Sequence, residues 1–155
     1  MKKSSAYLLL ILILSCKVAP EPIVYGETSC NFCSMTVVDK QHAAQLVTAK
    51  GKVFNFDALE CMINYLSEVE VQEIGLLLTN TYHQPEVLTE VQNCTFLISE
   101  GIPSPMGAYL TAFQTVGEAQ TALAEHHGEL FTWEELRVRF EKNPDISHNH
   151  VYHKH

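Results

Sequence analysis

Three sulfur-bearing side chains lie within six residues near the start of the chain. Cys30, Cys33 and Met35 form the pattern Cys-x-x-Cys-x-Met in the stretch CNFCSM. Two thiols and a thioether at this spacing can serve as a redox pair, a zinc knuckle or a site for a soft metal ion. Thiolate and thioether ligands favour Cu(I), whereas zinc is usually held by thiolate and imidazole. Met35 is therefore the residue that points to copper.

The other two chemistries fit the surrounding sequence less well. A zinc knuckle needs a second cysteine pair, but Cys61 and Cys94 stand apart from each other. A thioredoxin-type pair begins a helix after a buried strand, whereas this pair leads into the β-prone stretch MTVV. A thiol–disulfide redox role for Cys30 and Cys33 stays open as the alternative function.

A second methionine lies in a turn that can present it outside a helix. Met106 belongs to the stretch PSPMG, which begins at Pro103 and ends at Gly107. The prolines fix the backbone, and Gly107 permits a conformation that other residues resist. An isolated methionine more often fills a core. Met106 is thus a candidate ligand in combination with the cysteine motif.

The first residues resemble an export signal that ends at a lipid-bearing cysteine. Lys2 and Lys3 precede an uncharged run at residues 6–14, which is too short to span a bilayer. The Leu-Ser pair before Cys16 resembles the processing site of bacterial lipoproteins, which implies cleavage of residues 1–15 and acylation of Cys16. More than one acyl chain anchors a domain durably to a membrane. Residues 16–27, with two prolines, would form the lipidated tether.

Composition and charge predict an acidic globular protein. The chain has 155 residues, 46% of them hydrophobic and 18% charged, which suits one domain with its own core. The formal net charge is −8, and removal of Lys2 and Lys3 with the signal would make it −10. Binding of nucleic acid requires a basic surface, so we expect no nucleic-acid partner. Export permits disulfides, so two bridges among the four cysteines after Cys16 also stay open.

The elements that must position these side chains follow an order that recurs. β-Prone segments at 36–39 and 42–49, with KVFNF at 52–56, predict a hairpin. Asp57 and Glu60 have the spacing of a helix cap, and LLLT further on predicts a buried strand.

In the second half of the chain, VLTEV and CTFLIS predict two strands before the PSPMG turn. An apolar-periodic segment from Ala108 to Leu123 predicts one helix, or two short ones with the second capped by Thr115 and Glu118. A strand at ELFT and a helix opened by Thr132 follow.

Two rounds of strand, strand, helix and strand predict an α+β fold, built from two repeats within a single compact domain at residues 28–142. Residues 143–155 contain four histidines without apolar periodicity and predict a flexible, His-rich tail.

Three stretches, in this order, resemble the NosL family of copper-handling lipoproteins that are accessory to nitrous oxide reductase. They are CNFCSM, GKVFNFDALECM and SPMGAYLTAF…EHHGELFTWEEL, within about residues 23–140. The resemblance implies a fold like that of organomercurial lyase. It also implies a periplasmic, lipid-anchored Cu(I) chaperone that serves maturation of the reductase's copper centres, with an ABC-type transporter and its periplasmic subunit as partners and the reductase as indirect client.

The same resemblance assigns the ligands. Cys30, Cys33 and Met35 match the family's Cys-x-x-Cys-x-Met, and Met106 matches its Pro-Met-Gly. Ser34 stands where a glycine is common in the family motif, but this removes no sulfur.

The cysteine of the ECM stretch is a weaker candidate. Helical periodicity places Met62 in the core and Cys61 off the apolar face, so Cys61 is a reserve ligand. Cys94 is expected to be a buried small side chain. The sequence has no serine–histidine–acid arrangement and no phosphate-binding glycine loop, so we expect a binding protein and not an enzyme.

Overall fold

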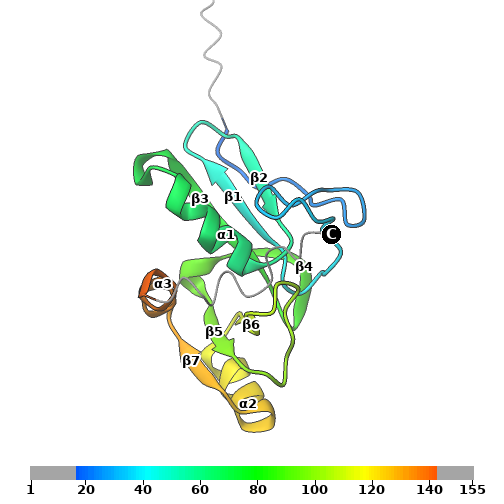
Figure 1. The fold of residues 1–155 in the computed structure, drawn as a ribbon, viewed down its shortest axis with the longest axis vertical. Coiled ribbons are helices and arrows are strands. Elements are labelled where there is room, and N and C mark those ends of the chain that lie inside the picture. The colour runs from blue at the N-terminus through cyan, green and yellow to red at the C-terminus, as the bar shows by residue number, and fades with distance from the viewer. Residues whose placement is uncertain (1–16, 143–155) are drawn as a thin grey trace, which may run out of the picture.

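The computed structural model describes residues 17–142 (Figure 1). The predicted signal peptide, Cys16 and the His-rich tail lie outside the described residues. Within residues 17–142, no helix is both long and apolar enough to cross a membrane.

The first half of the domain is a four-stranded antiparallel sheet with the order β2-β1-β3-β4. The predicted hairpin is present, with Ala44 opposite Phe56. Residues 36–39 do not form a strand, because Thr36 makes only an isolated bridge to Ser29. The elements are β1 (Ala44–Thr48), β2 (Val53–Phe56), α1 (Leu59–Tyr65), the 3-10 helices η1 (Leu66–Glu68) and η2 (Val71–Glu73), β3 (Ile74–Thr81) and β4 (Gln84–Glu90).

The second half is a three-stranded antiparallel sheet with the order β6-β5-β7. The apolar segment after Ala108 is not continuous helix. It begins as a fully buried strand paired with β5, and the helix starts only after Thr115. The elements are η3 (Val91–Asn93), β5 (Thr95–Ile98), β6 (Leu110–Phe113), α2 (Val116–His126), β7 (Glu129–Phe131) and α3 (Trp133–Lys142).

The two halves follow the same order of elements. In β1-β2-α1-β3 and in β5-β6-α2-β7, the first strand lies at the centre of its three and pairs antiparallel with both neighbours. Figure 1 shows the two sheets in one α+β domain. An origin of this order in an internal duplication, and the likeness to organomercurial lyase, stay predictions.

One large apolar core joins the halves. It contains Phe56, Leu59 and Met62 from the first half, and it continues through Phe96 and Trp133 of the second. Helix α1 contacts β1 and β2 of its own sheet and also β6 of the other. Because α1 lies at this junction, side chains at its start can meet groups from both halves.

Candidate metal centre

The cysteine motif forms a closed loop that is held against β2. The Cys30 N–H donates to the Met35 carbonyl at 2.7 Å, and the Ser34 N–H donates to the Cys30 carbonyl at 3.1 Å. Asn31 fixes the loop to the strand, because its N–H donates to the Asn55 carbonyl and its Oδ1 accepts the Asn55 N–H, both at 2.8 Å. These bonds direct the Cys30 side chain into the protein, where it is only 3% exposed.

Ser34 adopts a left-handed backbone conformation, with φ of 64°. This conformation costs most residues roughly 1–2 kcal/mol, and glycine adopts it freely. Ser34 therefore closes the loop at an energetic cost that a glycine would not meet.

The third cysteine comes from the first turn of α1. The sequence predicted that Asp57 caps this helix, and that prediction is wrong: the N-cap is Ala58, and no side chain caps the helix. Asp57 lies instead in the short loop between β2 and the helix, one residue before the N-cap. Cys61 is 1% exposed and lies on a buried side of α1 that faces the cysteine loop.

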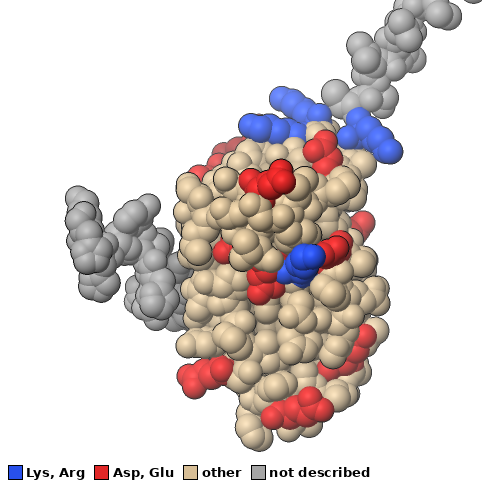
Figure 2. All heavy atoms as spheres, turned by 90° about the vertical axis from the view of Figure 1, so that its right-hand side faces the viewer, with Lys and Arg blue, Asp and Glu red and all other residues tan. Residues whose placement is uncertain are grey.

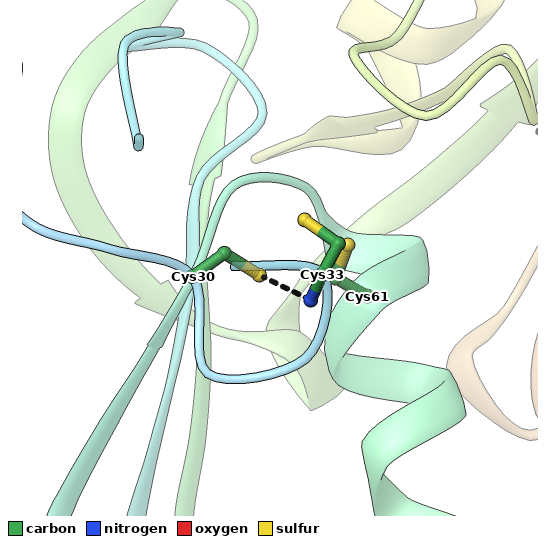
Figure 3. Close-up of side chains that lie close together, drawn as sticks. All are labelled: Cys30, Cys33 and Cys61. Carbon is green, nitrogen blue, oxygen red and sulfur yellow. Dashed lines mark hydrogen bonds between the residues drawn. The ribbon is translucent and has the colours of Figure 1, made fainter. Parts of the chain in front are cut away.

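The sulfur atoms of Cys30, Cys33 and Cys61 all lie within 4.8 Å of one another (Figure 3). None of the three forms a disulfide. An ion bound in the plane of three sulfurs at about 2.3 Å, the length of a zinc–thiolate bond, would hold them about 4 Å apart. Small side-chain adjustments thus suffice to place three sulfurs around one soft ion. We call these three residues the sulfur cluster.

The sulfur cluster holds one thiolate and two thiols. The pKa of Cys30 is lowered to about 5, first because the Cys61 thiol donates a hydrogen bond to it, against the opposing effect of burial. The Cys33 N–H also points at the Cys30 sulfur, at 3.5 Å. Burial raises the pKa of Cys33, and the Cys30 thiolate together with burial raises the pKa of Cys61. A cation that enters the cluster therefore meets a negative charge already in place.

Asp57 lies close to this charge. Its side chain is 1% exposed, and its pKa is raised by burial and, second, by the Cys30 thiolate. The Val38 N–H opposes this shift by hydrogen bonding to the carboxyl group. The carboxyl group of Asp57 thus belongs to the surroundings of the sulfur cluster and not to a helix cap.

The two candidate methionines have different surroundings. Met35 ends the cysteine loop, where its carbonyl accepts the Cys30 N–H, and the residue is 51% exposed. Met106 is partly buried and packs against the same core cluster that contains Cys30 and Cys61. This core runs through both halves of the domain, so the packing does not by itself bring Met106 to the sulfur cluster, and Met106 stays a predicted ligand.

A buried hydrogen bond holds the Met106 turn against α1. Ser104 donates its hydroxyl hydrogen to Glu60, which precedes Cys61 in the helix and is 1% exposed. The Ser104 oxygen also accepts the Leu110 N–H, and the turn closes through the Gly107 N–H and the Ser104 carbonyl at 3.0 Å. Gly107 has φ of 76°, as its proposed role in the turn requires. Burial raises the pKa of the Glu60 carboxyl group.

Within residues 17–142, the group of possible metal ligands that contains the three cysteines includes no histidine. His42 is buried, but its Nδ1 lies 3.0 Å from Asp39 and its Nε2 lies 3.2 Å from the Thr111 hydroxyl. The Nε2 atom makes this hydrogen bond, whereas Nδ1 is close to the Asp39 carboxylate without a hydrogen bond of good geometry. Cys94 is buried in the apolar core, and burial raises its pKa to about 12. This agrees with its expected role as a small core side chain.

A family model described as NosL matches residues 23–139, which is more than half of the chain. The chain belongs to the NosL family. Its structure is similar to the crystal structure of the copper chaperone NosL from Shewanella denitrificans, with a TM-score of 0.67 and 16% identity over 77% of this chain and 96% of that one. At this identity the likeness concerns the fold alone. No curated protein matches the sequence.

The structure brings Cys61, which the sequence had made a reserve ligand, next to the two cysteines of the motif. Periodicity placed one apolar face of α1 on the core, but the helix is buried on a second side by the cysteine loop. One feature of the sequence could have indicated that Cys61 lies near the cysteine loop. The stretch KVFNF leads directly into α1, so the strand that binds the loop through Asn55 also places the start of the helix close to that loop.

Proposed function

We propose that this protein is an extracytoplasmic copper chaperone that carries Cu(I) for the maturation of nitrous oxide reductase. The observation that carries this proposal is the sulfur cluster: three unpaired cysteine sulfurs within 4.8 Å, one of them a thiolate. Soft thiolates select Cu(I) over harder cations. Membership of the NosL family and the fold of a copper chaperone support the same conclusion.

Cu(I) is the cargo of the sulfur cluster. Cys30 offers a thiolate at neutral pH, whereas Cys33 and Cys61 must each lose a proton when they become ligands. Uptake by three thiolates therefore releases two protons. The two methionines add neutral sulfur: Met106 from the partly buried turn and Met35 from the surface.

Exchange of ligands provides a route for release. Met35 is exposed at the end of the cysteine loop, so a partner's sulfur or nitrogen ligand can approach the ion there while buried Cys30 and Cys61 still hold it. Met35 would bind the ion during transfer, and the buried cysteines would determine its affinity. The partners proposed are an ABC-type transporter and its periplasmic subunit, with nitrous oxide reductase as the indirect client.

Acylation of Cys16 would place this activity in the periplasm, at the membrane. The proposal contains no chemical transformation of a substrate, so the protein acts as a carrier and not as an enzyme.

Titration of the reduced protein with Cu(I) against a chromogenic chelator tests the proposal. We expect one ion per chain to be taken from the chelator. The Cys30→Ser/Cys33→Ser/Cys61→Ser variant should lose this uptake, whereas Cys94→Ala, which removes a core thiol, should retain it. Equal uptake by the triple variant would remove the proposal. A Met35→Leu/Met106→Leu variant, with Met62→Leu as the matched control for a buried methionine, measures the thioether contribution.

The Cys30 thiolate also permits a second function, that of a thiol–disulfide redox protein. Cys30 can attack a substrate disulfide and release one substrate thiolate. Cys33 then gives up its proton and attacks the mixed disulfide, so the substrate leaves reduced and Cys30–Cys33 becomes oxidised. Burial of Cys30 at 3% exposure disfavours this route. Incubation with a disulfide-bonded peptide separates the functions, because a copper carrier keeps its thiols and leaves the peptide oxidised.

A further inference from the structure

Three lysines gather at one end of the domain. Lys50 and Lys52 are exposed at the turn between β1 and β2. The Lys17 carbonyl oxygen lies 2.8 Å from the position that a Cβ on Gly51 would take, so the first described residue lies against this turn. Figure 2 shows basic side chains at this end of the molecule. We call Lys17, Lys50 and Lys52 the lysine end.

These cations differ from most others in the described part of the chain. Lys40 pairs with Glu86, Arg137 with Glu141, and Arg139 with Glu129. Within residues 17–142, no ion pair to a carboxylate is seen for any lysine of the lysine end, nor for Lys142 on α3. Lys52 instead lies over the Phe54 ring, 4.4 Å from its centroid. The acidic domain thus keeps three cations available at one end.

The first described residues are held against the four-stranded sheet. Residues 16–27 were expected to form a tether, yet Glu21 lies against β1 and Val18 against β3. The Glu21 N–H donates to Gln45 at 3.0 Å, and Gln45 donates to the Glu21 carbonyl at 2.8 Å. A Cβ on Gly75 would meet Val18 at 2.7 Å. Consecutive Cα atoms are about 3.8 Å apart. Acyl chains on Cys16 would therefore draw Lys17 to the level of the lipid headgroups.

We propose that the lysine end rests on the anionic phospholipid headgroups of the membrane that holds Cys16. The negative surface complements the three cations, and the anchor supplies the proximity. The inference goes beyond copper handling and rests only on the acylation of Cys16 contained in the proposed function.

This orientation has a consequence for the sulfur cluster. Asn55, which binds the cysteine loop, lies three residues beyond Lys52 on β2, which corresponds to roughly 10 Å along the strand. The hairpin then acts as a rigid spacer that keeps the cluster above the headgroups. A soluble partner can reach Met35 without displacing the domain from the membrane.

The expected electrostatic effect is limited by neighbouring acids. Glu68 and Glu73 line a cavity of about 380 Å³ together with Lys50 and Lys52. Exposed Glu70 lies between these two acids in the chain. One lysine near an anionic leaflet changes its occupancy about fivefold, and the acids keep the sum over three lysines close to this single contribution.

Lysine footprinting of the acylated protein tests this orientation. The protein is reconstituted in phosphatidylcholine vesicles with or without phosphatidylglycerol and modified briefly with a membrane-impermeant acetylating reagent. We expect the modification of Lys50 and Lys52, relative to Lys40 in the same molecule, to fall about fivefold when phosphatidylglycerol is present. High salt should abolish the difference, because it screens exposed charges.

Two variants keep the test specific. In Lys50→Gln/Lys52→Gln, the modification of Lys17 should no longer respond to phosphatidylglycerol. Lys142→Gln removes a cation from α3 and should leave the protection of Lys50 and Lys52 intact. Equal modification on both vesicle types would overturn the proposal, and so would a mature protein whose mass shows no acyl group on Cys16. Neither result depends on copper, so the carrier function is judged separately.

Discussion

The starts of α1 and α2 show how the two halves of the domain use the same local pattern differently. Thr115 and Glu118 form a complete capping box, in which the Thr115 hydroxyl accepts the Glu118 N–H and the Glu118 carboxylate accepts the Thr115 N–H. Asp57 and Glu60 have the same spacing at the start of α1 but cap nothing.

The acids of α1 serve the site. Asp57 lies near Cys30, and Glu60 accepts a hydrogen bond from Ser104 in the Met106 turn. Helix α1 therefore has no side-chain cap. Instead, the hydrogen bond between Glu60 and Ser104 links α1 to the second half of the domain. The comparison indicates that Asp57 and Glu60 act in and around the site, whereas Thr115 and Glu118 stabilise the start of α2.

The largest expected contrast is between the thiols Cys30 and Cys94. The pKa of Cys30 is lowered to about 5, whereas the pKa of Cys94 is raised to about 12. Ultraviolet thiolate absorbance should therefore show a step near pH 5 that Cys30→Ser removes and Cys94→Ala retains. Absence of any thiol ionisation below pH 7 would contradict the proposed state of the sulfur cluster.

The sign of the associated pH effect follows from linkage. The folded pKa of Cys30 lies below its ordinary value near 9, so the folded state binds this proton more weakly than the unfolded state. The contribution of Cys30 to stability is complete above pH 9 and is lost as the pH falls towards 5. Denaturation of the copper-free protein should show this slope, and Cys30→Ser should flatten it.

A second contrast concerns the two glutamates. Glu60→Ala should reduce the free energy of unfolding by about 2–4 kcal/mol, because it leaves a cavity and removes the acceptor of a buried hydroxyl. Glu118→Ala should cost only about 1 kcal/mol, the usual value of an exposed cap. Glu60→Gln is the matched control, since its amide oxygen can still accept from Ser104. Equal losses for both alanine variants in urea denaturation would break the comparison.

A third contrast separates stability from copper binding. Thr115→Ala removes the cap of α2 and should cost about 1 kcal/mol. Its Cu(I) affinity should equal that of the unmodified protein, because α2 contributes no residue to the sulfur cluster. Denaturation and chelator competition measure the two quantities. A weakened Cu(I) affinity in this variant would contradict the view that α2 contributes to stability and not to copper binding.

The smallest expected effect concerns the cysteine loop. Ser34→Gly should raise the free energy of unfolding by up to about 1 kcal/mol, because glycine adopts a φ of 64° without steric cost but loses more backbone entropy on folding. Ser34→Ala is the control, since alanine meets the same steric cost. Thermal denaturation of the copper-free protein would refute this explanation if alanine and glycine stabilised equally.

Local patterns in the sequence predicted the β1–β2 hairpin, the cap of α2 and the opening of α3 at Thr132, because short-range bonds determine these elements. The same rules failed at Asp57 and Glu60, where partners distant in sequence compete for the side chains. Strand β6 was merged with α2 because both are apolar, and only pairing with β5 distinguishes them. Cys61 was made only a reserve ligand for the same reason: its burial depends on a loop about 30 residues away in the chain.

The most direct test of the central claim is the Cu(I) affinity of Cys61→Ser, measured by chelator competition beside Cys94→Ala. If three thiolates hold the ion, loss of the α1 sulfur should weaken binding by at least about 100-fold, since it removes a direct ligand where even outer-shell changes cost 10–100-fold. Cys94→Ala should bind as the unmodified protein does. Unchanged affinity in Cys61→Ser would contradict this account. The ligands would then be those that the sequence alone predicted, which are Cys30, Cys33, Met35 and Met106.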